Sequence, residues 1–421
     1  MVRNVLVGVA MAVSACLLSA CVDSSRDSDT PSTNSNPSDD APPPEEFSIE
    51  GMLSNIATAL IVPNYESLAS TTAELASANG VLAEYCNSVG TAGEVAAKAL
   101  AEDAWKSTMT VIQSSEMHAL GPALENGSAL RNRILSFSSS PLETCGVDEI
   151  AVLRGEPGFD LAGRALNQRG FGAVGYLLFN SDLDHTCPPQ VPTTQDWNAR
   201  TENSRKVARC EAALVIAGDV SDAADTLRDA WLPGEGNFAE ALSSAENAGT
   251  NIQSMTDAMF YLETGVKDRK LGIPLGIIDA CSSLSCPNVV EARYSEFSLS
   301  AVRANLEAFL QIFQGGEGVG FDDLIDDEGF PEVTQRFIEN TNAAISLIDQ
   351  IDTPLFAQAS SIDSEAADLQ CTNAVASPDV TDELSACTLY GLIKRITDDL
   401  KIDFTTIVNV MLPDGAQGDN D

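Results

Sequence analysis

The chain has 421 residues, with 62 acidic and 23 basic side chains, so its formal net charge is −39 at pH 7. A field of this sign repels phosphate backbones, which excludes nucleic acid as a partner. The acidity is explained more simply by solubility in a salty environment than by a dedicated cation-binding surface, and it names no ligand by itself.

The first 20 residues are predicted to be a lipoprotein signal peptide. Arg3 precedes an apolar run over residues 5–18, which is too short to span a membrane comfortably. The run ends in the lipobox pattern Leu-Ser-Ala-Cys at residues 18–21, in which Cys21 is acylated and becomes the new N-terminus. An ordinary cleaved signal with a chance cysteine is the alternative. Because Val22 rather than aspartate follows, we expect a lipid-anchored protein of the cell envelope, on the outer membrane and facing the periplasm.

Residues 21–47 are expected to form a disordered tether, since they are mostly Ser, Asp, Pro, Asn and Thr with almost nothing to bury. Further along the chain, no segment reaches the ~18 uninterrupted apolar residues of a membrane helix. The acyl chains are therefore the only membrane attachment that the sequence predicts.

The remaining chain is predicted to be all-α with antiparallel helical-bundle packing. Apolar residues recur at spacings of three and four, and no alternating strand pattern bounded by hairpin turns is found. The apolar stripes are Ala101, Trp105, Met109 and Ile112; Ile252, Met255, Met259, Leu262 and Val266; Val302, Leu306, Phe309 and Phe313; and Leu389, Leu392, Ile396, Leu400, Phe404, Ile407 and Met411.

Two helical domains are expected, over residues 48–187 and 195–412, because prolines and small polar residues separate them. Two helix starts are predicted from capping residues. Thr91 and Glu94 form a capping box for one helix, and Ser298 is the N-cap of another.

The cysteines predict disulfides. Ten are present, and losing Cys16 with the signal and lipidating Cys21 leaves eight, an even number that indicates four bonds in an oxidising compartment. They are Cys86, Cys145, Cys187, Cys210, Cys281, Cys286, Cys371 and Cys387. Of the 105 connectivities, spacing favours 187 with 210, 281 with 286 and 371 with 387, which leaves 86 with 145, and the connectivity stays open. Zinc is the weaker reading, because no C-x-x-C pair occurs and the chain has only two histidines.

Several segments resemble the imelysin-like family, over roughly residues 50–412. They are Asn55–Ala57 with Ile61–Tyr65, Trp105 with Glu116–Pro122, Lys270–Gly276, and Pro287–Ser295 with Ser298–Ala308. The resemblance implies a two-domain helical fold, export to or anchoring in the bacterial envelope and an association with iron uptake. One branch of the family is classed as metallopeptidases.

The family's G-x-H-x-x-E signature is degenerate in this chain. The matching stretch begins at Gly170, and Gly172 stands in place of the histidine and Gly175 in place of the glutamate. A histidine and a glutamate three residues apart on a helix share a face and can reach one metal, whereas glycine can neither coordinate a metal nor accept a proton. We therefore expect no catalytic residue, metal or cofactor here. Glu116, Arg293 and Ser295 remain as candidate neighbours of a ligand site.

Other polar residues predict no site. His118 and Glu116 are two residues apart and point to different faces of a helix, so His118 is expected to be a polar residue at the helix end. His185 lies among aspartates that could chelate weakly, but solvation in a loop is the simpler reading. The acidic cluster at residues 322–328 has the oxygen ligands that suit calcium or magnesium, but a solvated acidic helix start is the simpler explanation.

From these observations we predict an imelysin-like envelope lipoprotein that acts by binding, within iron uptake, and that has lost the family's metal-dependent or catalytic pair. Its expected partners are the membrane, through the lipid anchor, and an iron-uptake or envelope protein. Two alternatives stay open. One is an active imelysin-type metallopeptidase with unrecognised ligands, and the other is a structural lipoprotein that docks a partner.

Overall fold

The computed structural model describes residues 47–417 except residues 235 and 382. The predicted signal peptide, the lipidation site Cys21 and all but the last residue of the predicted tether lie outside these residues. Within them every regular element is a helix, which confirms the all-α prediction. None of the described helices combines the length and the apolar character that crossing a membrane requires.

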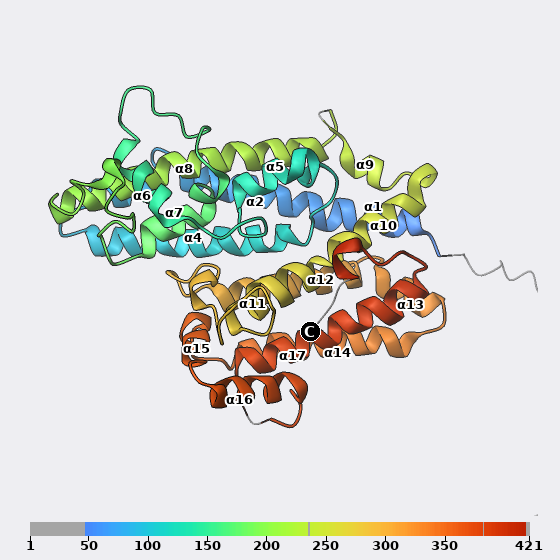
Figure 1. Cartoon of the computed structure of the whole chain (residues 1–421). Helices are drawn as coiled ribbons and strands as arrows, with labels where there is room; N and C mark the ends of the chain where they lie inside the picture. The colour runs from blue at the N-terminus through green and yellow to red at the C-terminus, as the bar shows by residue number, and fades with distance from the viewer. Residues whose placement is uncertain (1–46, 235, 382, 418–421) are drawn as a thin grey trace, which may run out of the picture. The chain divides into compact units, whose positions relative to one another are not determined.

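The helices follow the chain in two groups (Figure 1). The first comprises α1 (Ile49–Asn55), the π-helix η1 (Ile56–Ile61), α2 (Val62–Ala76), α3 (Val81–Ser88), α4 (Glu94–Glu116), η2 (Gly121–Ala123), α5 (Glu125–Ile134), α6 (Thr144–Leu153), η3 (Leu166–Gln168), α7 (Phe171–Phe179), η4 (Pro192–Thr194) and α8 (Glu202–Trp231). The second comprises α9 (Phe238–Leu242), η5 (Ala245–Asn247), α10 (Ala248–Met259), the π-helix η6 (Leu262–Gly272), α11 (Ile273–Leu275), η7 (Pro287–Val289), α12 (Ser298–Gln314), α13 (Phe321–Asp327), α14 (Pro331–Ile348), α15 (Leu355–Ser361), α16 (Glu365–Ala376), α17 (Ala386–Asp399), the π-helix η8 (Leu400–Phe404), α18 (Thr405–Ile407) and η9 (Asp414–Ala416).

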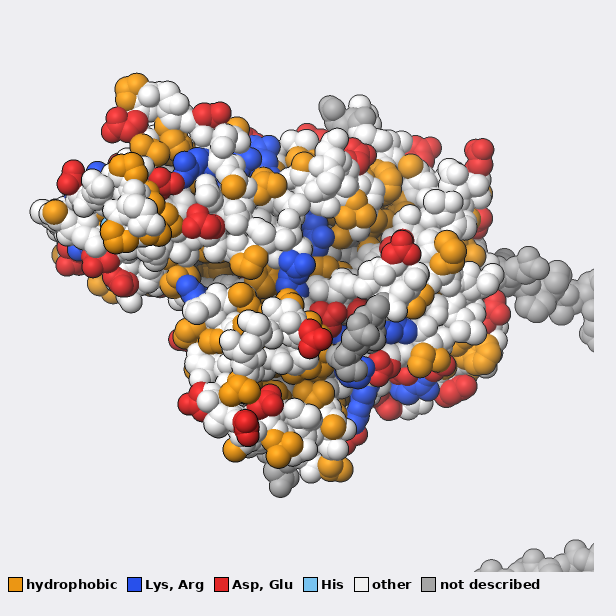
Figure 2. Space-filling view, in the orientation of Figure 1, with side chains coloured by type: hydrophobic (Ala, Val, Ile, Leu, Met, Phe, Trp, Pro, Cys, Tyr) orange, Lys and Arg blue, Asp and Glu red, His pale blue; other side chains and the backbone are white. Residues whose placement is uncertain are grey.

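The long helices α2, α4 and α8 lie side by side in the first group, and α12, α14 and α17 form the centre of the second (Figure 1). Packing of α4 against α12 joins the two groups, so their buried side chains form one continuous core. The boundary expected between residues 187 and 195 stays a prediction. The helix after it, α8, packs against α2, α5 and α7, which precede it. Acidic side chains are spread over both groups on the face shown in Figure 2.

The predicted apolar stripes are buried along the helices that carry them. In α4 and α12 every stripe residue is buried, from Ala101 to Ile112 and from Val302 to Phe313. The stripe over residues 252–266 is also buried throughout, although it crosses from α10 into the π-helix η6. The last stripe is wrong only at its C-terminal end, because α18 ends at Ile407. Met411 lies beyond it and is exposed.

Both predicted helix starts differ in detail from the structure. Glu94 is the first residue of α4, and its carboxylate accepts from the backbone N–H of Gly90 at 2.7 Å instead of that of Thr91. The Thr91 hydroxyl accepts from the N–H of Gly93 at 3.2 Å. Ser298 lies inside α12 and donates its hydroxyl hydrogen bond to the carbonyl of Glu291, which ties the start of this helix to the preceding segment.

All eight cysteines among the described residues form disulfides, and two of the favoured pairs are confirmed, Cys281–Cys286 and Cys371–Cys387. The other two pairings are wrong. Because α3 packs against α8, Cys86 bonds to Cys210, with Cα atoms 5.4 Å apart. The chain after α7 returns to α6, so Cys187 bonds to Cys145, with Cα atoms 4.5 Å apart. Closeness along the chain did not predict these pairs, because helix packing decides which cysteines meet.

Candidate functional site

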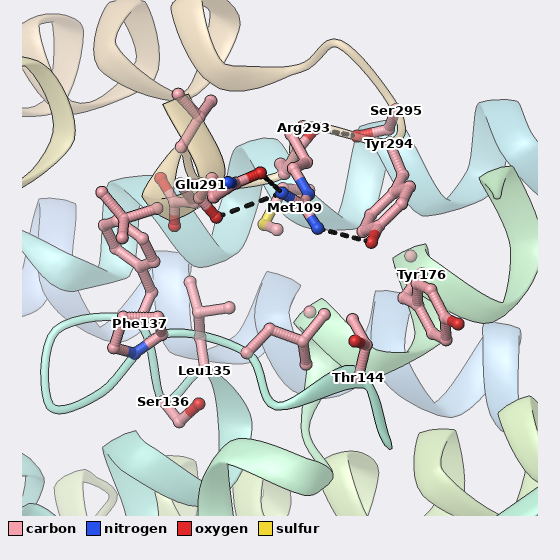
Figure 3. A pocket seen from close by; sticks show the side chains of 18 of the residues that line it. Met109, Leu135, Ser136, Phe137, Thr144, Tyr176, Glu291, Arg293, Tyr294 and Ser295 are labelled. Carbon is pink, nitrogen blue, oxygen red and sulfur yellow. Dashed lines mark hydrogen bonds between the residues drawn. The ribbon is translucent and has the colours of Figure 1, made fainter. Parts of the chain in front are cut away.

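A small cavity lies between the two groups of helices (Figure 3). Its walls come from α4, α7, the segment 135–142 between α5 and α6, and the segment 288–295 that precedes α12. Its volume is about 60 Å³, well below the ~150 Å³ of an engineered cavity that holds benzene. The cavity therefore suits a ligand of a few heavy atoms.

The α7 wall contains the degenerate motif. Gly170 is the N-cap of α7, and its φ of 83° is a left-handed conformation that favours glycine. Gly172 and Gly175 both line the cavity. The helix of the resembled motif is thus present, and both substituted positions face the same space.

Trp105 on α4 occupies the room that a side chain at position 175 would need. A Cβ atom on Gly175 would lie 2.6 Å from Cζ2 of Trp105, whereas one on Gly172 would meet only methyl carbons of Leu135 and Leu142, at 3.8 and 3.9 Å. The Trp105 indole is held in place, since its Nε1–H donates to the Phe171 carbonyl at 3.2 Å and its ring stacks on Phe171 with centroids 5.4 Å apart. The indole of Trp105 therefore occupies the space next to Gly175, the position at which the resembled motif has a glutamate.

The facing wall, segment 288–295, is polar and tightly turned. Ala292 adopts a φ of 51° just before Arg293, a conformation that non-glycine residues rarely take. The Arg293 guanidinium donates to the Asn288 side-chain oxygen at 2.8 Å and to the Tyr294 hydroxyl at 2.7 Å. In Figure 3, Arg293 and Tyr294 lie next to each other across the cavity from Leu135 and Thr144.

A buried charged cluster centred on Lys270 joins the two groups of helices at the level of Glu291. The ammonium of Lys270, on η6, lies 3.0 Å from a carboxylate oxygen of Glu116 and 3.2 Å from one of Glu291. It also donates to Asn305 at 2.8 Å and to Gln113. All five side chains are buried. Because α4, η6, α12 and the cavity wall each contribute a member, the cluster fixes the cavity wall against both groups.

The two carboxylates of this cluster differ in their acidity. Burial alone would raise the pKa of Glu116, but Lys270, Arg131 and hydrogen bonds from Tyr261 and Ser138 together lower it. Burial raises the pKa of Glu291, and the Lys270 charge opposes this rise only in part. Lys270 has a raised pKa despite its burial, because both carboxylates favour its charged form. The cluster therefore holds a permanent cation and at least one anion.

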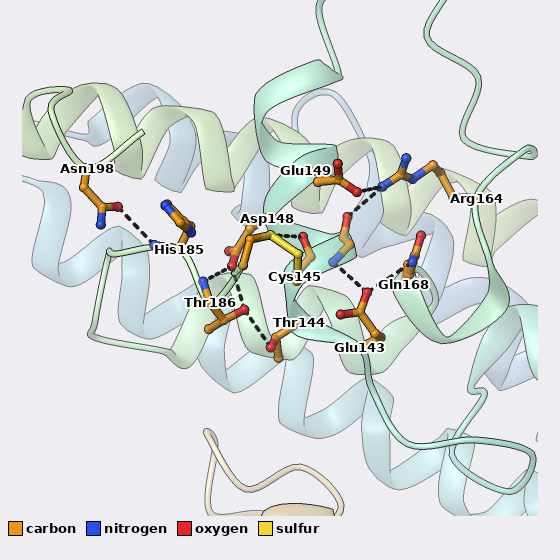
Figure 4. Close-up of a disulfide and its surroundings, with 12 residues drawn as sticks. Glu143, Thr144, Cys145, Asp148, Glu149, Arg164, Gln168, His185, Thr186 and Asn198 are labelled. Atoms are coloured by element: carbon orange, nitrogen blue, oxygen red, sulfur yellow. Dashed lines mark hydrogen bonds and ion pairs between the residues drawn. A yellow bond between two sulfur atoms is a disulfide. The ribbon is translucent and has the colours of Figure 1, made fainter. Parts of the chain in front are cut away.

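Hydrogen bonds through Asp148 connect the α7 wall to the Cys145–Cys187 disulfide. Figure 4 shows the surroundings of this disulfide. The hydroxyl of Tyr176, which lines the cavity, donates to Asp148 at 3.0 Å. Asp148 also accepts from the backbone N–H of Thr186 at 2.7 Å, and Thr186 precedes the cysteine of the Cys145–Cys187 bond. Burial raises the pKa of Asp148 although these hydrogen bonds oppose the rise.

The structure separates the candidate neighbours named from the sequence. Arg293 and Ser295 line the cavity, whereas Glu116 lies in the Lys270 cluster and reaches the cavity only through Lys270 and Glu291. Sequence reasoning missed the roles of Trp105, Tyr176 and Glu291, although all three lie within or next to the segments that carried the resemblance. Their burial and mutual contacts come from packing of residues far apart in the chain.

The remaining candidates lie elsewhere. His118 lies directly after the end of α4 and is buried, with Nδ1 3.2 Å from the Asn64 side-chain oxygen. Burial lowers the pKa of His118 to about 3. His185 is half-buried, with Nδ1 shielded from solvent and without a hydrogen bond among the described residues. Asp322 and Asp323 lie in the first turn of α13, as predicted, and Asp323 accepts from the Gly320 N–H at 3.0 Å. The other three acids of the cluster lie at the C-terminal end of this helix instead: Asp326, Asp327 and Glu328.

The side chains of the cavity do not fit a transition metal. The two motif positions offer no donor atom, and the nearest replacement is the indole ring of Trp105. Across the described part of the chain, no three side chains of His, Cys, Asp or Glu gather in a way that could hold a metal ion. The donor set that remains is one of hydroxyls, one carboxylate and one guanidinium around apolar walls.

Comparison with known proteins agrees with this architecture. A family model described as imelysin matches residues 61–380. No curated protein sequence matches the chain. The fold is similar to that of an imelysin-like protein from Psychrobacter arcticum 273-4, with a TM-score of 0.62 at 14% identity over 87% of this chain and 98% of that one. It is also similar to a candidate iron-regulated protein A precursor from Parabacteroides distasonis ATCC 8503, with a TM-score of 0.55 at 15% identity over 84% of this chain and 95% of that one.

Proposed function

The chain belongs to the imelysin family, and from this premise we propose that it acts by binding a small ligand in the cavity, without metal-dependent chemistry. One observation carries the proposal: the position of the motif glutamate is a glycine whose side-chain space is filled by Trp105. A carboxylate could not be added there without moving the indole, which is buried, hydrogen-bonded and stacked.

The groups that remain are suited to binding. Apolar side chains of Trp105, Met109 and Leu135 offer contact area, and Arg293, Tyr294 and Ser295 offer polar groups on one wall. Ligand sites are commonly apolar cavities with a few placed polar groups. Segment 288–295 is held by the Lys270 cluster, which orders the polar wall before a ligand arrives.

The proposed location is the outer membrane, with the folded part in the periplasm and Cys21 as the lipid anchor. The lipobox at residues 18–21 motivates this proposal. Four disulfides among the mature cysteines are consistent with an oxidising compartment.

We place the function within iron acquisition, with an iron-uptake or other envelope protein as the partner. The similar fold of a protein described as iron-regulated supports this placement. If it is right, loss of the gene slows growth under iron limitation, and a gene encoding Cys21→Ser does not restore the growth rate.

A metal and cleavage assay tests the binding proposal. The mature chain is purified after exposure to iron and to zinc, its metal content is measured, and it is incubated with an unfolded protein. We expect less than stoichiometric metal and no cleavage, with Gly172→Leu giving the same result. Stoichiometric metal that is lost in Gly172→Leu, together with cleavage of the substrate, would instead show an active metallopeptidase.

A further inference from the structure

We propose that the ligand of the cavity is a small monocarboxylate, with its carboxylate bound by Arg293 and its short apolar part against Trp105 and Met109. This inference rests on the proposed binding function and specifies its chemistry.

The first argument is the charge of Arg293. The sequence has 62 acidic and 23 basic residues, and most arginines of the described residues lie within 4.0 Å of a carboxylate oxygen. In the part of the chain that the structure describes, no ion pair includes Arg293. Arg200 and Arg269 share this property, but neither lines the cavity. The cavity therefore contains a cation whose counter-charge the protein itself does not provide.

The second argument is that Arg293 is oriented and still has donors. Its guanidinium makes hydrogen bonds to the Asn288 carbonyl at 3.3 Å, to the Asn288 side chain at 2.8 Å and to the Tyr294 hydroxyl at 2.7 Å. It also lies over the Tyr294 ring, 4.8 Å from the centroid. A guanidinium has five N–H donors, so at least two are left for a ligand. A planar, fixed guanidinium loses little freedom when it binds a carboxylate.

The third argument is that the other charged group of the cavity is already compensated. Glu291 lies 3.2 Å from the Lys270 ammonium and accepts from Gln113 at 3.0 Å. It therefore does not offer a free anion to an amine, and Lys270 offsets its repulsion of a ligand carboxylate. This asymmetry favours a monoanion over a cation or a zwitterion.

The fourth argument is size and polarity. Trp105, Met109, Leu135, Phe137 and Leu142 present apolar surface to the cavity. With a volume of about 60 Å³, the cavity admits a chain of a few carbons. A carboxylate carried by such a chain matches both the single guanidinium and the apolar walls. The same chemistry occurs at the C-terminus of a peptide, so the test must distinguish the two sources.

Calorimetric titration of the mature chain carrying Cys21→Ser tests the proposal with three probes of similar size: propionate, propionamide and propylamine. We expect propionate to bind, and the uncharged propionamide and the cationic propylamine to bind at least about tenfold more weakly, as expected for loss of a charge-assisted hydrogen bond. Equal binding of propionamide, or no binding of propionate, would overturn the inference. Tighter binding of a tripeptide with a free apolar C-terminus would overturn the assignment to a free monocarboxylate.

Variants separate this inference from the proposed function. Arg293→Gln should weaken propionate binding about tenfold or more, while Arg200→Gln, at an arginine outside the cavity that also has no ion pair among the described residues, should leave it unchanged. Gly172→Leu should abolish binding by filling the cavity, since a side chain there meets only Leu135 and Leu142. Loss in Gly172→Leu with unchanged binding by Arg293→Gln would refute the role of Arg293 but keep the cavity as the site. Unchanged binding in Gly172→Leu would refute the cavity itself.

Discussion

The two walls of the cavity differ in chemistry, although buried hydrogen bonds and a neighbouring disulfide hold each of them in place. The α7 wall has Gly172 and Gly175 at the two positions that correspond to the histidine and glutamate of the resembled motif, and the Trp105 indole fills the space next to Gly175. The facing wall is polar, with Arg293 and Glu291 backed by the Lys270 cluster. A disulfide lies next to each wall, Cys145–Cys187 for one and Cys281–Cys286 for the other. The contrast places the charged side chains that line the cavity, Glu291 and Arg293, on one wall, and leaves residues 172 and 175 of the other wall without side chains.

The strongest test of the polar wall is Lys270→Met. This change leaves Glu116 and Glu291 buried without their shared cation, and breaking a buried pair costs about 3–5 kcal/mol. Urea unfolding measures the loss. The control is Lys98→Met, which removes a half-buried i,i+4 pair with Glu102 on the protein surface and should cost under about 1 kcal/mol. Similar losses in both variants would show that the cluster does not stabilise the wall.

The two disulfides can be compared by replacing each pair with alanines. Cys145 and Cys187 are 42 residues apart, whereas Cys281 and Cys286 are 5 apart. Restriction of the unfolded chain then predicts losses of about 4 and about 2 kcal/mol respectively. Unfolding free energies give the order. A larger loss for the shorter loop would mean that native contacts, such as the Thr186 to Asp148 hydrogen bond, outweigh chain entropy.

The pH dependence of stability tests whether His118 is kept neutral by its burial. The pKa of His118 falls from 6.5 to about 3 in the folded state, so the unfolded chain binds the extra proton first. The stability that neutral His118 contributes is complete above pH 6.5 and is lost as the pH falls toward 3. Between pH 7.5 and pH 5 this loss is about 2 kcal/mol.

In His118→Asn, the free energy of unfolding should differ less between pH 7.5 and pH 5 than it does in the parent protein. His185→Asn, at the other histidine, serves as the matched control. An unchanged pH dependence in His118→Asn would assign it to other groups.

The smallest expected change in stability comes from alanine substitutions at the two glycines of the α7 wall. Gly175→Ala brings a Cβ within 2.6 Å of Trp105, and such overpacking costs about 1–3 kcal/mol. Gly172→Ala makes only ordinary contacts at 3.8 Å and should stabilise the protein by up to about 1 kcal/mol through helix propensity. Opposite shifts in the unfolding midpoint are expected. Stabilisation by both changes would mean that Trp105 moves freely out of the way.

Sequence periodicity predicted the buried face of the helices well, both in the uninterrupted α-helices α4 and α12 and where α10 is followed by the π-helix η6. It failed at Met411, because the apolar spacing continues beyond Ile407, where α18 ends. The loss of the motif side chains was readable from Gly172 and Gly175. That Trp105 fills one position was not, since Trp105 and Gly175 are brought together only by packing of α4 on α7. The same reason explains the two wrong disulfide pairs.

The position of the Lys270 ammonium depends on the number of residues in the π-helix η6. Glu263, Lys267 and Lys270 are all buried along its 11 residues. Each residue of an ordinary helix turns the chain by about 100°. Deleting one uncharged residue of this segment, such as Thr264 or Val266, would therefore rotate the rest of the helix and carry the Lys270 ammonium away from both carboxylates, even though every charged residue would still be present. In this segment the number of residues is as much a part of the site as their identity, so relatives with an altered length here should differ in the whole cluster.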